Sequence, residues 1–252
     1  MKTLATYSIK GGVGKTSAAV NLAHLAAAAG LRTLVWDLDP QGAATYLLGV
    51  KPRVKGGGAA LVSGRRSLDD AIRSSNLGQV AVLPSDFSYR NLDLQLDDAK
   101  RPTQQVRRLL EPLRGDYDLV VLDCPPSISM VSENVFAAAD LLLVPALPTA
   151  LSLRPLEQLT DFVAAMDKPR PAVRAFFSMV DRRKNLHREV VGRPPARGQT
   201  FLPTSVPADS LVERMAVTRR PVVASHASSR AALAYRLLWH DCAGLLWPDG
   251  RP

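Results

Sequence analysis

The sequence has few cysteines and no long hydrophobic run. Only two of the 252 residues are cysteine, Cys124 and Cys242, and they lie far apart without C-x-x-C spacing. This scarcity excludes a disulfide framework and a zinc site built from protein ligands alone, and it predicts a reducing cytoplasm. No apolar run reaches the roughly 18 residues of a membrane span. Because an apolar strand begins almost at the N-terminus, we also expect no secretory signal.

Acidic residues are scarce in the last third of the chain. Residues 1–167 hold 17 Lys/Arg and 17 Asp/Glu, whereas residues 168–252 hold 15 and 6, so all of the net charge of +9 lies after residue 167. The densest segment runs from Lys168 to Arg197, with nine basic residues and two acidic ones. A neutral front and a basic back favour a polyanionic partner. The alternative is an arginine-rich composition spread over solvated faces.

Apolar strands and helical segments alternate along the whole chain. This pattern predicts an α/β fold: a single domain over 1–252 with a mostly parallel sheet and helices on both faces. We expect a polar, glycine-rich loop at 51–58. The expected strands are 4–9, 34–37, 80–85, 117–122, 140–145, 172–180 and 201–206. The expected helices are 17–29, 43–48, 68–74, 102–113, 151–166, 210–217 and 228–247.

A glycine-rich loop, K-G-G-V-G-K-T at 10–16, separates the first strand from the first helix. Glycines let the backbone approach an anion, several N–H groups converge there, and the helix dipole favours negative charge. Lys15 supplies a mobile charge for β/γ-phosphates, and Thr16 supplies a hydroxyl for Mg²⁺. The ordinary P-loop motif needs glycine at position nine, where Ile9 stands, and Lys10 is an extra lysine. The predicted phosphate-binding residues are Gly11, Gly12, Val13, Gly14, Lys15, Thr16 and Ser17.

Two further strands end in aspartate. The second strand delivers D-L-D-P-Q-G at 37–42, and the apolar strand at 117–122 is followed by Asp123. Ligands of open parallel sheets bind outside the carboxyl ends of the strands, so these carboxylates should face the glycine-rich loop. An apolar strand ending in aspartate is a Walker B pattern, in which the carboxylate holds Mg²⁺. For Asp37, a simple strand-end cap is the alternative.

Together these motifs resemble the ParA/MinD family of deviant-Walker-A ATPases. The resemblance rests on 10–16, on 37–42 and on D-Y-D-L-V-V-L-D-C-P-P-S at 116–127. Asn134, A-A-D at 138–140 and S-M-V-D-R-R-K-N-L at 178–186 extend it over nearly the whole chain. It implies a doubly wound P-loop NTPase fold and a homodimer that forms with ATP. It also implies slow ATP hydrolysis stimulated by an activating partner, either ParB-like or a cargo adaptor.

The resemblance also implies a role for each site residue. Lys15 would hold the phosphates of its own nucleotide, and Lys10 would reach across the dimer to the phosphates of the partner. Asp39 would orient the attacking water. The residues implied around Mg²⁺ are Thr16 and Asp123 as ligands, with Asp37 shaping the surroundings of the metal.

Two segments depart from the chromosome-partitioning pattern. Those proteins carry arginines just after the proline of the last turn, whereas this chain has A-D-S-L at 208–211, closer to the turn of MinD-like members. The resemblance still makes Pro207 and Asp209 candidate adenine contacts, and Asp209 can also cap the helix that follows. The loop at 147–149 lacks the Gln and Glu common in partitioning proteins. The cargo therefore cannot be transferred from the family.

The leading hypothesis is an ATPase associated with the nucleoid that segregates or positions a cargo, such as a plasmid, a chromosome region or a protein complex. Its dimer would bind DNA without sequence preference, through contacts to phosphates. The candidate DNA-binding residues are Arg182, Arg183, Lys184, Arg188, Arg214, Arg219 and Arg220.

Two other classes remain open from the sequence. A MinD-like membrane switch needs a basic amphipathic C-terminal helix, but residues 231–247 contain Arg236 as their one Lys or Arg, which favours packing in the core. ATP-dependent small-molecule ligases and iron–sulfur carriers share the fold. The carriers need paired cysteines, and a cluster at Cys124 beside the Walker B aspartate is disfavoured. A ligase would need a substrate pocket that the sequence does not indicate.

Overall fold

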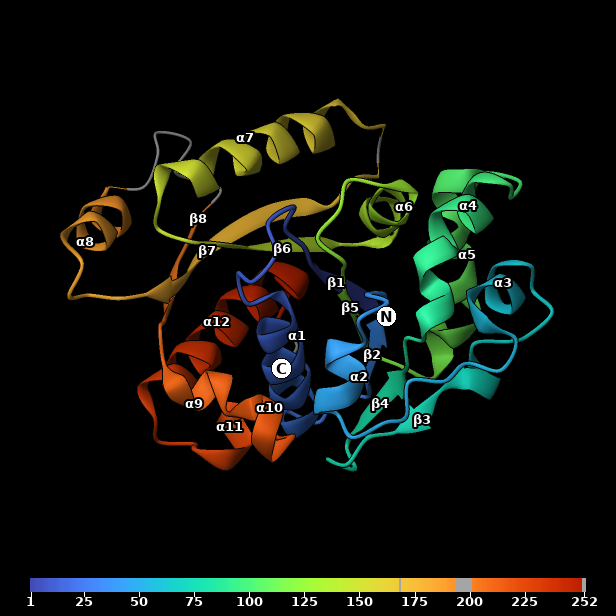
Figure 1. Ribbon diagram of the computed structural model, residues 1–252, viewed down its shortest axis with the longest axis horizontal. Helices are drawn as coiled ribbons and strands as arrows, with labels where there is room; N and C mark the ends of the chain where they lie inside the picture. The colour runs from blue at the N-terminus through green and yellow to red at the C-terminus, as the bar shows by residue number, and fades with distance from the viewer. Residues whose placement is uncertain (168, 194–200, 251–252) are drawn as a thin grey trace.

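In the part of the chain that the structure describes, eight strands form one sheet, and the helices pack on it (Figure 1). The computed structural model describes residues 1–167, 169–193 and 201–250. From one edge to the other the strands are β3 (Arg73–Ser74), β4 (Val80–Leu83), β2 (Thr33–Asp37), β5 (Leu119–Asp123), β1 (Lys2–Thr6), β6 (Leu141–Ala146), β7 (Ala172–Val180) and β8 (Phe201–Pro207). Every neighbouring pair is parallel except β3 with β4. The predicted mostly parallel α/β fold is confirmed.

The central strands are apolar on both faces because hydrophobic clusters cover both. In β1, Leu4 packs into one cluster and Ala5 into the other. In β5, Val121 packs into the cluster of Leu4 and Val120 into the cluster of Ala5. Side chains alternate between the faces of a strand, so a strand covered on both sides becomes a continuous apolar run. This burial fixes the register that brings the strand ends together at the site.

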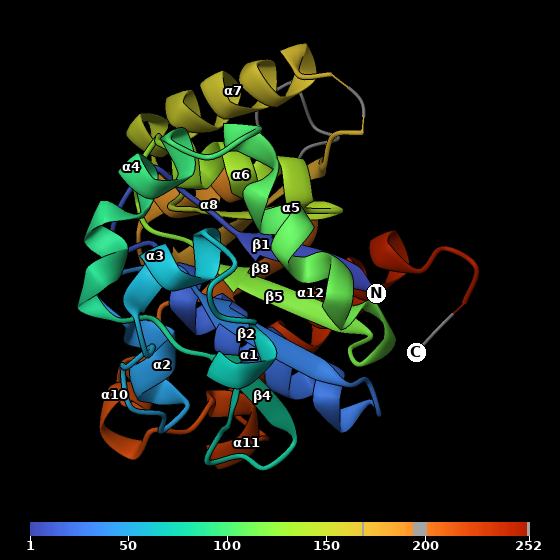
Figure 2. The same ribbon diagram turned by 90° about the vertical axis from the view of Figure 1, so that its right-hand side faces the viewer.

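The helices form a layer on each side of the sheet (Figures 1 and 2). One cluster packs the sheet against α1 (Lys15–Ala28), α2 (Ala43–Leu47), α9 (Ser210–Glu213), α10 (Met215–Thr218), α11 (Val222–Ser225) and α12 (Arg230–Leu246). The other cluster packs it against α3 (Gly57–Val62), α4 (Leu92–Asp97), α5 (Gln105–Leu110), α6 (Met130–Ala138) and α7 (Ala150–Ala165). The helix α8 (Asn185–Gly192) follows β7 and lies at the left of Figure 1.

Some predicted boundaries are wrong. The first strand ends at Thr6 rather than at residue 9, because the chain leaves the sheet to form the glycine-rich loop. Residues 68–74 are not a helix: a single 3-10 turn at Asp69–Ala71 leads into β3, which pairs antiparallel with β4. The expected loop at 51–58 overlaps the start of α3, and the helix expected at 210–217 is divided into α9 and α10.

Asn134, which the resemblance singled out, joins α6 to α5. Its Oδ1 accepts from the N–H groups of Gln105 (2.8 Å) and Val106 (3.2 Å). Its Nδ2 donates to the carbonyls of Pro102 (2.7 Å) and Met130 (2.9 Å). The amide therefore satisfies N–H groups at the start of α5 that the helix leaves without partners. In this structure Asn134 stabilises the packing of α6 against α5.

Candidate functional site

The glycine-rich loop lies between the end of β1 and the start of α1, at the carboxyl edge of the sheet. Gly14 precedes α1 with φ of 95° and caps it without any side-chain hydrogen bond, so the first N–H groups of α1 are left for an anion. A Cβ at Gly14 would also stand 3.0 Å from Ser178 Oγ. Both the positive φ and this close approach require glycine here.

Lys15 opens α1 directly after Gly14. Its side chain is 7 % exposed, and its Nζ donates to the carbonyl oxygen of Lys10 at 3.4 Å. Burial lowers the pKa of Lys15, and the negative charge of Asp123 acts in the opposite direction. The ammonium is held against the loop backbone, where a phosphate bound by the N–H groups would meet it.

Asp123 is fully buried at the end of β5. Its Oδ1 accepts from the Thr6 hydroxyl at 3.2 Å, and its Oδ2 has no hydrogen-bond partner within the described residues. Burial raises the pKa of Asp123, as does the neighbouring carboxyl of Asp37, while the Thr16 hydroxyl and the Lys15 ammonium lower it. A buried carboxylate oxygen without a partner is costly, and a cation would remove that cost.

Asp37 stands opposite Asp123 in the register of β2 and β5. Its Oδ2 accepts from both the backbone N–H and the hydroxyl of Thr45, each at 2.7 Å, and its Oδ1 accepts from the Asp39 N–H at 3.2 Å. Burial raises the pKa of Asp37. Because both oxygens are occupied, Asp37 fixes the turn between β2 and α2, which is the capping role left open above. Its influence on a metal stays a prediction.

Asp39 is half-buried and lies in the turn that Asp37 fixes. Its Oδ1 accepts from the Gln41 N–H at 2.9 Å, and its carbonyl accepts from the Ser85 hydroxyl at 2.6 Å. The backbone of Asp39 is therefore tied to β2 on one side and to the end of β4 on the other. Such a fixed carboxylate at the carboxyl edge is suited to orient a water molecule.

Lys10 is exposed, and its Nζ lies 3.5 Å from Ser152 Oγ at the start of α7. The structure thus records the Lys10 ammonium against α7. Its predicted contact with a partner's nucleotide involves a second chain and stays a prediction.

Pro207 and Asp209 lie at the same edge of the sheet. The N–H of Ala208 donates to the Val180 carbonyl at 3.1 Å, which ties the end of β8 to the end of β7 beside the loop. Asp209 Oδ1 accepts from the Leu211 N–H at 3.0 Å, so the predicted cap of the following helix is confirmed. The adenine contacts of Pro207 and Asp209 stay predictions.

The predicted DNA-binding residues fall into two groups. Arg182, Arg183 and Lys184 form the turn between β7 and α8, with Arg188 on α8. The Arg183 side chain is 91 % exposed and pairs with Asp181 at 3.0 Å, which holds the pKa of Asp181 down at about 2. Lys168 and Arg197, which bound the basic segment, lie outside the described residues.

The second group is Arg214, Arg219 and Arg220, around α10. The Arg219 guanidinium lies 4.2 Å from the centre of the Tyr46 ring, and the Arg219 carbonyl accepts from Asn76 Nδ2 at 2.8 Å. Arg219 also adopts φ of 49°, which is unusual for a residue other than glycine. Arg219 is therefore engaged with α2, as Arg183 is with Asp181.

The donor set suits magnesium better than a metal held by protein alone. Within 1–167, 169–193 and 201–250 no group of three or more His, Cys, Asp and Glu side chains is placed to hold a metal ion. Both cysteines are buried and free. Mg²⁺ needs only one or two carboxylates together with phosphates and water, which Asp123 and Thr16 beside the loop can accommodate. In the part of the chain described, no helix has the length and apolarity needed to span a membrane.

The hydroxyl side chains that hold the site and were not identified from the sequence include Thr6, Thr45, Ser85 and Ser152. Thr6 and Thr45 are fully buried, each against one of the buried aspartates. A polar position inside an otherwise apolar segment could have indicated them, because a buried hydroxyl needs a partner. Ser152, which contacts Lys10, carried no such signal, since serine is ordinary near the start of a helix.

The burial of Asp123 predicts how the stability of the nucleotide-free protein depends on pH. In the folded protein the pKa of Asp123 is raised from the ordinary 3.8 to about 8. Between these two pKa values the folded state therefore binds more protons than the unfolded state. The free energy of unfolding therefore falls as pH rises through this window. Asparagine does not ionise, so Asp123→Asn should gain stability relative to wild type between about pH 5 and about pH 8.

Urea unfolding of both proteins at the two pH values measures this difference. Asp98→Asn, at an exposed position, serves as the control and should follow wild type. A difference between Asp123→Asn and wild type that does not change with pH would contradict the prediction.

Comparison with known proteins places the chain in a family. A family model described as an AAA domain (AAA_31) matches residues 1–174. An uncharacterised protein of Pseudomonas putida is 32 % identical over 243 residues, which are 94 % of this chain and 92 % of the relative. The chromosome partitioning protein ParA of Caulobacter vibrioides is 32 % identical over 197 residues, 75 % of this chain and 74 % of that protein.

Solved structures share the fold over the whole chain. The crystal structure of cobyrinic acid a,c-diamide synthase from Mycobacterium smegmatis, with bound ATP analog and magnesium, superposes with a TM-score of 0.83 at 24 % identity and covers 100 % of this chain and 97 % of that one. Four observations agree on one family: the fold, the loop at 10–16, the paired strand ends of β2 and β5, and the ParA relative. The chain belongs to the ParA/MinD family of P-loop ATPases.

Proposed function

We propose that this protein binds ATP with Mg²⁺ at the loop of residues 10–16 and hydrolyses it slowly. The ATP-bound form is a homodimer that binds DNA without sequence preference and so segregates or positions a cargo in the cytoplasm. An activating partner, ParB-like or a cargo adaptor, stimulates hydrolysis and resets the switch. The observation that carries the proposal is that α1 begins at Lys15 without a side-chain cap, while Asp123 Oδ2 has no hydrogen-bond partner among the described residues.

Phosphate binding follows from these groups. The N–H groups after Gly14 and the Lys15 ammonium supply positive charge to the β- and γ-phosphates. Thr16 and Asp123 hold Mg²⁺, which neutralises charge that develops on the phosphates. The Asp39 carboxylate accepts a hydrogen bond from the attacking water and so points the water at the γ-phosphate. Pro207 and Asp209 contact the adenine base.

Lys10 makes the reaction depend on a second subunit. In the single chain its ammonium lies 3.5 Å from the Ser152 hydroxyl. In the ATP dimer it reaches the partner's phosphates and adds a cation where charge develops, as an arginine finger does in trans. Nucleotide state and assembly are thereby coupled, which gives the switch.

Non-specific DNA binding rests on the exposed turn at 182–184 and on Arg188. These cations follow β7 at the carboxyl edge, the same edge as the nucleotide loop. Contacts of lysine and arginine to phosphates carry affinity without sequence reading. Breaking the ion pair between Arg183 and Asp181 costs little free energy, because exposed ion pairs contribute little to stability.

A membrane-associated positioning ATPase is the second candidate. The exposed side chains Leu233 (50 %) and Leu237 (60 %) of α12 are what favours it. Against it, most of the apolar side chains of α12, including Tyr235, Leu238 and Trp239, are buried in the core against α1 and β8. A helix that holds the core cannot leave it for a lipid surface without a large cost. Flotation with liposomes in the presence of ATP distinguishes the two candidates.

Alanine substitutions of the two loop lysines should impair different steps. Lys15→Ala removes the charge on the β/γ-phosphates, so ATP binding should be abolished. Lys10→Ala should leave ATP binding by the single chain intact but lose the ATP dimer and the stimulated hydrolysis. Fluorescent-nucleotide titration and size-exclusion chromatography with a non-hydrolysable analogue measure both effects. Wild-type ATP affinity in Lys15→Ala, or an equal dimer fraction in Lys10→Ala, would contradict the assigned roles.

The basic turn should determine the salt dependence of DNA binding. Each phosphate contact contributes roughly 0.9 to the slope of log affinity against log salt, and two arginines per subunit make up to about four contacts per dimer. Arg182→Ala/Arg183→Ala should therefore weaken duplex binding and flatten this slope, with ATP hydrolysis and dimerisation retained.

A salt titration with ATP present compares wild type, this double variant and Arg219→Ala/Arg220→Ala as the matched pair from the second group. A loss confined to the 219/220 pair would move the surface to α10. If neither pair changes the affinity, or if wild type does not bind DNA, the DNA-binding part of the proposal is wrong.

A further inference from the structure

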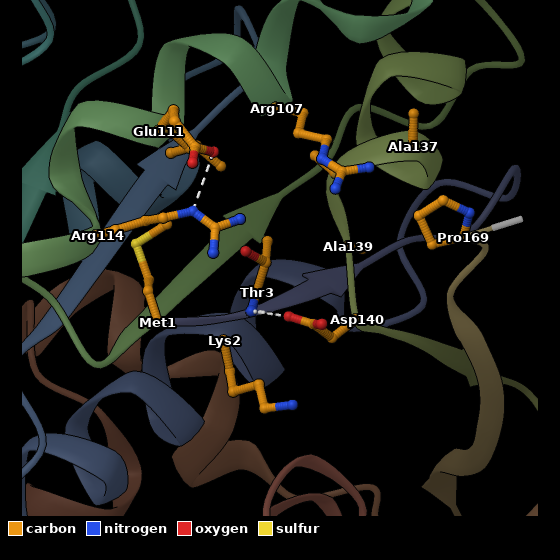
Figure 3. Close-up of a pocket in the computed structure, with 12 residues that line it drawn as sticks. Met1, Lys2, Thr3, Arg107, Glu111, Arg114, Ala137, Ala139, Asp140 and Pro169 are labelled. Atoms are coloured by element: carbon orange, nitrogen blue, oxygen red, sulfur yellow. Dashed lines mark hydrogen bonds and ion pairs between the residues drawn. The ribbon is translucent and has the colours of Figure 1, made fainter.

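A cavity of about 270 Å³ opens at the amino edge of the sheet, at the opposite end of β1 from the nucleotide loop (Figure 3). Its floor is the start of β1 and the residues just before β6, and its wall is α5 with the 3-10 turn that follows it. We call it the amino-edge basin and define it by the residues that line it through charged or backbone groups: Lys2, Thr3, Arg107, Glu111, Arg114 and Asp140.

Three of these residues are cations, and their charge is only partly neutralised. Glu111 Oε2 pairs with Arg114 through Nε at 3.0 Å, so the single carboxylate of Glu111 offsets one of the three cations. Within the described ranges, neither Lys2 nor Arg107 has a carboxylate partner. Figure 3 shows the guanidinium groups of Arg107 and Arg114 directed into the hollow from neighbouring turns of the same wall.

Within the described ranges the acidic residue on the floor, Asp140, forms no ion pair with these arginines, and its negative charge remains. Asp140 Oδ2 accepts from the Thr3 N–H at 2.7 Å, and the Asp140 N–H donates to the Thr3 carbonyl at 2.8 Å. One oxygen of the carboxylate thus joins β1 to the start of β6, and the basin holds three side-chain cations against two carboxylates. The cations also lie in residues 1–167, where basic and acidic residues are equal in number. The surplus of positive charge in the basin is therefore local, and the basic composition of the last third of the chain does not explain it.

We propose that the amino-edge basin binds a small phosphorylated anion. Two guanidinium groups facing one hollow match the oxygens of a phosphoryl group, because each can donate two parallel hydrogen bonds. The volume is just below the roughly 300–1,000 Å³ of drug-sized ligand sites, so the ligand is of the size of a diphosphate or a sugar phosphate. Lys2, on the floor, adds a point charge of the kind that phosphates accept.

The basin is independent of the nucleotide site. The five residues of β1 separate the two sites, a rise of about 16 Å for an extended strand. None of the residues that line the basin belongs to the loop of residues 10–16 or to the acidic strand ends. The two sites can therefore be tested apart, by disabling the loop and asking whether anion binding survives.

The test is calorimetric titration with pyrophosphate and with a sugar phosphate, in wild type and in Lys15→Ala without added metal. Lys15→Ala removes the lysine of the loop and should retain the basin. In that background Arg107→Ala and Arg114→Ala should each weaken pyrophosphate binding by about tenfold or more. Arg108→Ala removes an exposed arginine next to Arg107 that does not line the basin, and it should stay within about twofold of its parent.

Several results would overturn the proposal. Binding that disappears in Lys15→Ala would place the anion in the nucleotide loop. Absence of binding at about 10 mM pyrophosphate and sugar phosphate would show that the basin has no useful affinity. Equal affinity in Arg107→Ala, Arg114→Ala and Arg108→Ala would remove the site from the basin. Succinate that binds as tightly as pyrophosphate would show that the pocket prefers no phosphoryl group. Circular dichroism of each variant confirms that the exposed substitutions leave the fold intact.

Discussion

The buried carboxylate of Asp123 is the constraint on which the site depends. It ends the strand next to β1 and contacts Thr6, and within the described part of the chain one of its oxygens has no hydrogen-bond partner. A carboxyl group buried in this way either keeps its proton, as its raised pKa indicates, or binds a cation that offsets the cost of burying the charge. The neighbouring Asp37 is satisfied by Thr45 and so does not compete for that cation. Magnesium bound to a nucleotide fits this combination.

The sheet brings these groups together from distant parts of the sequence. Parallel pairing of β2 with β5 and of β5 with β1 sets Asp37, Asp123 and the glycine-rich loop at one edge, and β7 and β8 add Ser178 and Asp209. Helices on both faces make the register rigid, because a slip of one residue would turn every apolar side chain to the wrong cluster. The same scaffold leaves the opposite edge open, where the amino-edge basin gathers Arg107 and Arg114.

Most of the sheet and the phosphate loop could be predicted from the sequence, because long apolar runs and glycine spacing are strong local signals. The helix predicted at 68–74 is wrong because a short amphipathic pattern does not distinguish a helix from a 3-10 turn followed by an edge strand. The helices α4, α6 and α8 were not foreseen, and α8 follows a basic segment that resembles a loop. The roles of Thr45 and Ser152 are contacts between distant segments, which no local pattern encodes.

The central claim is that Lys10 acts on the nucleotide of a partner chain. Mixing Lys10→Ala protein with Asp39→Ala protein tests it most directly. If Lys10 acts in trans, the mixed dimer has one site with both an intact Asp39 and a lysine from the other subunit, so two inactive proteins should regain ATP turnover on mixing. If Lys10 acts on its own nucleotide, every site of the mixed dimer lacks one group, and mixing should restore nothing. Turnover that stays at the level of the separate variants would contradict the account.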